Sequence, residues 1–186
     1  MLIPFDPMKV TQAGAVLLKT EPARRMSRLR LLKLLYIADR EALKERSRPI
    51  TGDRLAAMDH GPVLSHTYDM IKGAEVFSPM WEQHLRPVGR DIELASDPGV
   101  AKLSRYEVRK LQEVAARLRD DSDWDVAQYT HGFAEWQKNQ PPAKSSKPIP
   151  LDDLLDALGL ADRKQELLAV ERAENVLERL VSSTKP

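Results

Sequence analysis

The stretch that decides the fold is Lys33–Gly73, which reads KLLYIADREALKERSRPITGDRLAAMDHGPVLSHTYDMIKG. Ser27, just upstream, is a good N-cap and predicts a helix from there to about Glu45. Apolar side chains occupy nearly the whole circumference of this helix: Leu29, Leu31, Leu32, Leu34, Leu35, Tyr36, Ile37 and Ala38. A helix that is apolar all round is normally covered on every side, so we expect this one to be the centre of the core.

The end of the same stretch predicts a second helix, which stops at Gly73. Pro62 suits the first position of that helix, with Gly61 before it as the cap. Between the two helices, Leu55–Met58 fits either a short strand or a helical turn, and the pattern does not decide between them.

The flanking sequence adds helices and one hairpin. A first helix is predicted over Val10–Lys19, and further helices begin at the capping serines Ser104 and Ser122. Within Trp81–Leu94, apolar and charged residues alternate around a Gly-Arg turn, which predicts a small β-hairpin. The expected fold is therefore mainly α (α+β), a compact helical domain around a central buried helix, with a small β-hairpin and C-terminal helices.

Composition divides the chain into three parts. Residues 1–140 have the patterns of one domain, residues 141–149 form a linker rich in proline, lysine and serine, and residues 150–186 form a C-terminal helical extension. The extension contains two amphipathic segments whose apolar stripes must be covered. The main domain, a second copy of the chain in a homodimer, or another partner could cover them.

Composition also limits the classes of function. The chain has 186 residues, 42% hydrophobic and 31% charged, with a formal net charge of +1, so its overall charge provides no general attraction to nucleic acid or membranes. It has no cysteine, no apolar run long enough for a membrane helix, and no signal peptide at its N-terminus. We therefore expect a cytoplasmic protein that neither spans nor binds a membrane, and the sequence indicates no cofactor.

Polar residues on the central helix are the first candidates for a functional site. Tyr36, Asp39 and Arg40 are three and four positions apart and therefore neighbours on the helix surface. Because Asp39 follows an apolar run, its carboxylate needs a partner, and Asp53, Arg54 and His60 are on segments that could approach it. We favour a structural role, in which the Asp39 carboxylate holds the next loop in place, over a role in a surface patch that binds a partner protein.

Histidines and nucleophiles give weaker signals. His60, before the Gly61-Pro62 dipeptide, suits a hydrogen-bonded turn better than a catalytic base. The spacing of His60, His66 and the nearby aspartates fits no standard metal motif, so no metal site is predicted. The sequence contains no nucleophile elbow and no phosphate-binding glycine loop, so we assign no catalytic residue.

A cluster of basic residues is a candidate for binding nucleic acid. It consists of Arg24, Arg25, Arg28, Arg30 and Lys33. Such a cluster can contact phosphates, but it lacks asparagine or glutamine to read bases. We favour a solvated basic rim, or pairing with acidic loops such as Asp120-Asp121, over DNA binding.

Taken together, Tyr36-Ile37-Ala38-Asp39-Arg40, Pro49–Asp53, His60-Gly61-Pro62-Val63 and Tyr68 resemble the SocA-like Panacea antitoxin domain family, and the resemblance covers about residues 10–140. It implies an antitoxin that binds and neutralises a cognate toxin encoded nearby. It also implies a second mechanism, in which the antitoxin is an adaptor that delivers the toxin to a ClpXP-type protease. Members of the family occur in phages and mobile elements, which makes phage defence a setting for this chain.

From the residues and the resemblance we expect a partner-binding groove formed by Tyr36, Asp39, Arg40, Asp53, His60 and Tyr68. Two alternatives stay open. One is a hydrolase or nucleotide-modifying enzyme that uses Asp39, His60 and Asp53, and the other is a DNA-binding transcriptional regulator that uses the basic cluster.

Overall fold

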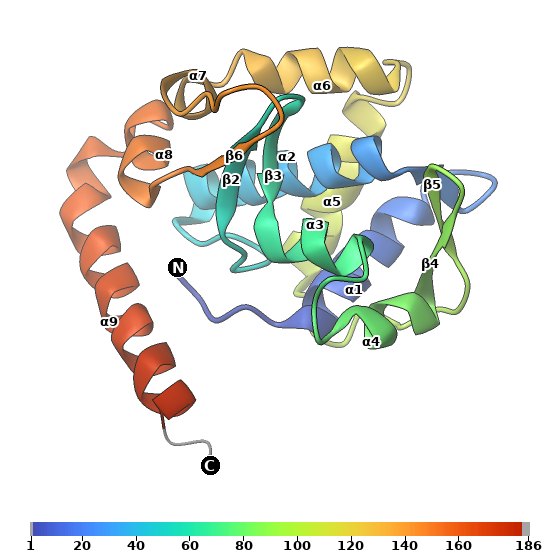
Figure 1. The fold of residues 1–186 in the computed structure, drawn as a ribbon, viewed down its shortest axis with the longest axis horizontal. Helices are drawn as coiled ribbons and strands as arrows, with labels where there is room; N and C mark the ends of the chain where they lie inside the picture. Colours follow the sequence, from blue (N-terminus) through green and yellow to red (C-terminus); the bar gives the residue numbers. More distant parts are fainter. Residues whose placement is uncertain (1, 184–186) are drawn as a thin grey trace.

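The computed structural model describes residues 2–183, and its centre is one long helix. This helix, α2 (Arg28–Arg46), crosses the middle of the molecule and is surrounded by the other elements (Figure 1). Ser27 caps it by accepting a hydrogen bond from the Arg30 amide at 3.0 Å. Its apolar side chains are buried on all sides, as predicted: Leu31, Leu32, Leu34, Leu35, Tyr36, Ile37, Ala38, Ala42 and Leu43.

Three helices pack closely against α2: α1 (Pro7–Leu18), α5 (Arg105–Arg117) and α6 (Asp123–His131). A fourth, α7 (Ala134–Lys138), contacts α2 through the Glu135 side chain. The capping serines are where the sequence places them. Ser104 and Glu107 form a reciprocal capping box at α5, and Ser122 forms another with Asp125 at α6. Phe133 and Trp136 are buried in the core.

The predicted β-hairpin is confirmed, with an extra strand beside it. Strands β4 (Leu85–Val88) and β5 (Asp91–Leu94) pair in antiparallel register, and β1 (Arg25–Ser27) pairs with the other edge of β5. A short helix, α4 (Ser78–His84), leads into the hairpin and places Trp81 in the core with none of its surface exposed. This sheet therefore closes one end of the helical core.

A second sheet corrects the prediction that Pro62 starts a helix. Strand β2 (Leu55–Met58) pairs in antiparallel register with β3 (Gly61–Leu64), and helix α3 (Ser65–Ile71) begins only afterwards. Proline has no amide hydrogen for a strand ladder, but β3 is an edge strand, with β2 as its neighbour in the order β3-β2-β6. Gly61 has a φ of +93°, a conformation that favours glycine at the turn between the strands.

Residues 141–149 contribute the third strand of that sheet. Strand β6 (Ser146–Pro148) pairs in antiparallel register with β2, and the amide of the buried Ile149 donates to the Leu55 carbonyl at 2.9 Å. Helix α8 (Leu151–Ala157), a 3₁₀ turn, η1 (Ala161–Arg163), and helix α9 (Lys164–Ser183) follow. This segment forms a second apolar cluster with Leu2 and Leu43, consisting otherwise of Leu154, Leu155, Leu158 and Leu167.

Candidate functional site

Asp39 is buried in the middle of α2, and its carboxylate binds the connector that follows the helix. It accepts hydrogen bonds from the backbone amides of Ile50 and Thr51, both at 2.9 Å, and from the Thr51 hydroxyl. Burial raises the pKa of Asp39 to about 7, although these hydrogen bonds act in the opposite direction. The side chain therefore fixes the loop between α2 and β2, as the favoured structural interpretation of the sequence predicts.

Asp53 is also buried, and its carboxylate binds the start of the next helix, α3. Its two oxygens accept the His66 amide at 2.9 Å, the Thr67 amide at 2.8 Å and the Thr67 hydroxyl at 2.7 Å. Leu64, at the N-cap position of α3, has no side-chain acceptor for these amides, so Asp53 caps the helix from a distance. Burial raises the pKa of Asp53, against the effect of its hydrogen bonds.

A buried glutamate joins the other two candidates on α2. Glu135, whose side chain is completely buried, accepts the Tyr36 hydroxyl at 3.1 Å and pairs with the Arg40 guanidinium at 2.7 Å. The same guanidinium lies over the ring of Phe133, 4.2 Å from its centroid. Burial, followed by the nearby Glu135 carboxylate, raises the pKa of Tyr36 well above its ordinary value.

Sequence reasoning missed Glu135 because only the fold brings it to α2. One signal was present: a glutamate stands between Phe133 and Trp136, and such large aromatic side chains are usually buried. An acidic side chain within a buried segment needs a cationic or hydrogen-bonding partner. Arg40 and Tyr36, on a helix predicted to be central, could satisfy that need.

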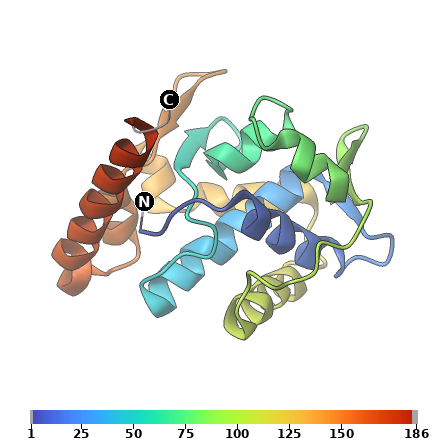
Figure 2. The same ribbon diagram turned by 90° about the horizontal axis from the view of Figure 1, so that it is seen from below.

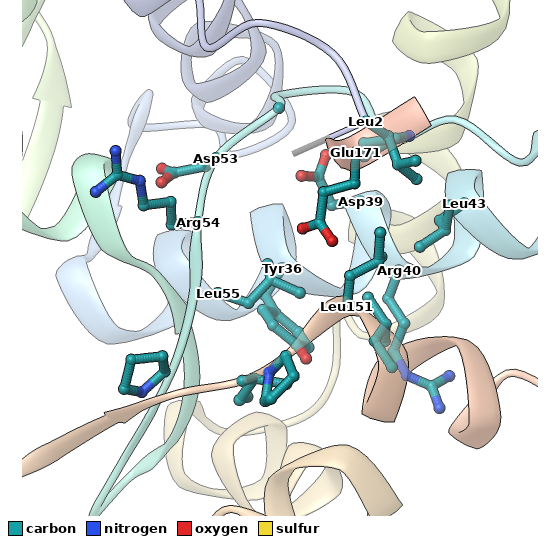
Figure 3. A pocket seen from close by; sticks show the side chains of 16 residues that line it. Leu2, Tyr36, Asp39, Arg40, Leu43, Asp53, Arg54, Leu55, Leu151 and Glu171 are labelled. Atoms are coloured by element: carbon teal, nitrogen blue, oxygen red, sulfur yellow. The ribbon is translucent and has the colours of Figure 1, made fainter. Parts of the chain in front are cut away.

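A cavity of about 210 Å³ lies beside β2 and brings four of the six predicted residues together (Figure 3). Tyr36, Asp39, Arg40 and Asp53 all line it. Its other walls are mainly apolar and include residues 148–151 and Leu154 of the C-terminal segment, together with Arg54 and Glu171. The space could hold a small apolar group beside charged neighbours, and the C-terminal segment covers it.

The other two predicted residues, His60 and Tyr68, do not line the cavity. His60 is exposed in the turn between β2 and β3, with its ring edge-on to the ring of Trp124 at a centroid distance of 6.0 Å. Tyr68 is half-buried on α3, and the Lys72 ammonium lies 5.0 Å from the centroid of its ring. His60 therefore does not join Asp39 and Asp53 in one constellation.

A polar cluster that the sequence did not indicate surrounds Gly61. The Lys33 side chain is completely buried and donates to the Pro62 carbonyl at 2.7 Å. Burial lowers the pKa of Lys33 to about 7. His131 stacks on Trp136 with ring centroids 4.3 Å apart, and its Nε2 is buried without a hydrogen-bond partner.

The basic cluster is divided among different structural tasks. Arg25 pairs with Asp91 at 2.7 Å, and Arg28 donates to the Gly89 carbonyl at 3.0 Å. Arg30 is buried and donates to the carbonyls at the end of α5 and to Asp121. With Lys33 buried as well, these residues do not form one continuous phosphate-binding surface.

Neither a cluster of potential metal ligands nor a membrane-spanning helix occurs in the part of the chain that the structure describes. In residues 2–183, no three histidine, aspartate or glutamate side chains gather in a way that could hold a metal ion. Across the same residues, no helix has the length and hydropathy needed to cross a membrane.

The fold and site define a helical domain whose buried carboxylates organise the loops and helices around one central helix. The family model described as "Antitoxin SocA-like, Panacea domain" matches residues 31–137, more than half of the chain. The chain therefore belongs to the SocA-like Panacea antitoxin family. No curated protein and no solved structure gives a significant match. The matched region contains the Lys33–Gly73 stretch and Glu135, whereas β6, α8 and α9 follow it.

Proposed function

We propose that this chain is an antitoxin that neutralises a cognate toxin protein by direct binding. The observation that carries the proposal is the family match over residues 31–137, which spans α2, the β2–β3 hairpin, α6 and α7. The catalytic alternative has less support, because Asp39 and Asp53 use their carboxylate oxygens on backbone amides and His60 is outside the cavity.

The six predicted partner-binding residues have two roles in this proposal. Tyr36, Asp39 and Asp53 are buried and hold the binding surface in shape through their hydrogen bonds. Arg40, His60 and Tyr68 are at least partly accessible and contact the toxin directly. A rigid set of buried contacts of this kind keeps the surface organised before the partner arrives, which reduces the entropic cost of binding.

The exposed pair His60–Trp124 is the proposed centre of the contact. Trp124 is 53% exposed, and tryptophan is enriched among the residues that dominate binding energy in protein interfaces. Its ring meets that of His60, in the β2–β3 turn, edge to face. A toxin that covers this pair would bury an aromatic surface held by α6 and the second sheet.

Co-expression with each neighbouring reading frame tests the proposal, with growth rescue and pull-down as the two measurements. We expect rescue of one toxic neighbour together with a stable complex. The double variant His60→Ala, Trp124→Ala should lose both, while Phe77→Ala, which truncates another exposed aromatic residue, should retain both. Rescue without a complex would instead support delivery of the toxin to a ClpXP-type protease. In that case, growth rescue should be lost in a host that lacks the protease. Failure of every neighbour to be toxic or to bind would overturn the proposal.

A further inference from the structure

A second pocket, outside the site described above, is lined by basic side chains from separate segments of the chain. It has a volume of about 290 Å³ and lies where the last turn of α2 meets the first turn of α1 and the start of α5. Four basic residues line it: Lys9, Arg46, Arg48 and Lys102. The one carboxylate in its wall is that of Glu107. Because these residues are far apart in sequence, only the fold brings them together.

The two lysines of the pocket already have counter-ions within the chain. Lys9 pairs with Glu107 at 2.6 Å, and Lys102 pairs with Asp6. The Glu107 carboxylate also accepts the backbone amide of Ser104 at 2.7 Å. The acidic residue that lines the pocket is therefore engaged by the lysine and the helix cap, and it does not neutralise the two arginines.

The two arginines, by contrast, have no such partner. Arg46 and Arg48 are exposed, and neither guanidinium forms a hydrogen bond or an ion pair with any residue that the structure describes. Arg46 instead lies over the ring of Tyr106, 4.9 Å from its centroid, and the Tyr106 hydroxyl donates to Glu45 at 2.8 Å. The aromatic contact positions the Arg46 guanidinium at the pocket and leaves its N–H groups unpaired.

These unpaired donors identify the chemistry of a ligand. A guanidinium presents parallel N–H groups that match the oxygens of a carboxylate or a phosphate. One carboxylate, with one charge and two oxygens, satisfies one arginine. A phosphate monoester has three terminal oxygens and a charge of about −1.5 to −2 near pH 7, which suits two. We propose that this pocket binds the phosphate group of a small phosphate monoester through Arg46 and Arg48.

Ser104 supplies a third donor for the same group. Its hydroxyl oxygen accepts the amide of Glu107 at 3.2 Å, while its own proton has no acceptor among the residues that the structure describes. Two guanidinium groups and one hydroxyl thus line the pocket, one donor group for each terminal phosphate oxygen. The volume is at the small end of the range for ligand sites, so the rest of the ligand is a body of a few carbon atoms.

The pocket is separate from the proposed toxin contact. Figure 2 shows the last turn of α2 and α5 along the lower side of the molecule, whereas the β2–β3 hairpin lies on the upper side. Along α2, Arg46 is about 20 Å from Lys33, which contacts the hairpin through the Pro62 carbonyl. Phosphate binding therefore does not depend on the antitoxin function and can be measured on the chain alone.

Isothermal titration calorimetry on the full chain tests the proposal, with inorganic phosphate, methyl phosphate and acetate as probes at constant ionic strength. The titrations extend to about 30 mM, because ligands of so few atoms bind weakly. We expect one saturable site for both phosphates and at least about tenfold weaker binding of acetate. Arg46→Gln and Arg48→Gln should each raise the Kd for methyl phosphate about tenfold. Arg90→Gln, which removes another exposed arginine, should leave it unchanged.

Four results would overturn the proposal, provided that circular dichroism shows every variant to be folded. The first is the absence of saturable binding by either phosphate. The second is an equal loss of affinity in Arg90→Gln, which would indicate a general effect of charge. The third is acetate binding as strong as that of methyl phosphate, which would make the pocket a carboxylate site. The fourth is much tighter binding of a single-stranded DNA oligonucleotide that is lost in Arg46→Gln and Arg48→Gln, which would make the pocket part of a nucleic-acid surface.

Discussion

Thr51 binds Asp39 through both its backbone and its side chain, although twelve residues separate them. Its amide donates to Asp39 Oδ1 at 2.9 Å, and its hydroxyl donates to Oδ2. The Thr51 hydroxyl also accepts the amide of Asp53 at 3.1 Å, and Asp53 in turn caps α3. One chain of buried hydrogen bonds thus links α2, the connector and α3 across the stretch that decides the fold.

Removing the carboxylate at the start of that chain should destabilise the protein strongly. Asp39→Ala leaves the amides of Ile50 and Thr51 and the Thr51 hydroxyl without their acceptor in a buried site, at a cost of about 3 kcal/mol or more. Urea unfolding followed by circular dichroism would measure the loss. Asp120→Ala, in an exposed loop, is the control and should change the free energy of unfolding by less than about 0.5 kcal/mol. Equal stability of the two variants would contradict this role of Asp39.

Glu135 should be as important for stability as the residues that the sequence indicated. Glu135→Ala removes the partner of Arg40 and the acceptor of the Tyr36 hydroxyl, and we expect a loss of about 3 kcal/mol. Tyr36→Phe deletes only one hydrogen bond and should cost about 1 kcal/mol. A double-mutant cycle between Arg40→Ala and Glu135→Ala would measure the coupling of the ion pair. Strictly additive effects would show that the two side chains do not interact as the geometry indicates.

Lys33 should make stability depend on pH in the alkaline range. Its pKa is about 7 in the folded chain and about 10.5 when unfolded, so between these values the unfolded chain binds one proton more. The free energy of unfolding should therefore rise with pH from about 7 to 10, by up to about 1.4 kcal/mol per pH unit. Lys33→Met should remove this rise. Urea unfolding at pH 7, 8 and 9 compares the original chain with Lys33→Met. An equal change of the free energy of unfolding with pH in the two proteins would contradict the prediction.

Gly61 should tolerate no side chain. A Cβ atom there would lie 2.5 Å from the Thr130 hydroxyl oxygen and 3.0 Å from Lys33 Nζ, at a backbone φ of +93°. Gly89 also has positive φ but has open space where a Cβ would be, so Gly89→Ala isolates the backbone strain. We expect a loss of about 1 kcal/mol for Gly89→Ala and of more than about 3 kcal/mol for Gly61→Ala. Thermal melts measure both, and similar losses would show that the space around Gly61 can expand.

Ending the chain after Ile149 should leave a folded but weaker domain. The truncation keeps β6 on β2 and removes α8 and α9, which exposes Leu2 and Leu43 of the second apolar cluster. Losing the cover of one buried leucine costs about 1.5–3 kcal/mol, so the melting temperature should fall while the helical signal of residues 2–149 persists. A truncated chain without a cooperative melt would show that the C-terminal helices are part of the core.

The sequence by itself determined where three of the helices begin and which of them is central. Ser27, Ser104 and Ser122 are local signals, because a capping serine needs only the amides two or three residues ahead of it. The apolar circumference of α2 is equally local, since it depends on helical periodicity alone. The hairpin also followed from alternation within one short segment.

Tertiary structure decided the remaining features because they depend on partners distant in sequence. Pro62 has the local signature of a helix start, yet its place on the edge of a sheet makes the missing amide harmless. Whether Asp39 is a contact surface or an internal acceptor depended on which loop folds over it, and Glu135 became part of the site only when α7 packed beside α2. Local preferences select the elements, but the charge partners and the side that each element buries are set by packing across the whole chain.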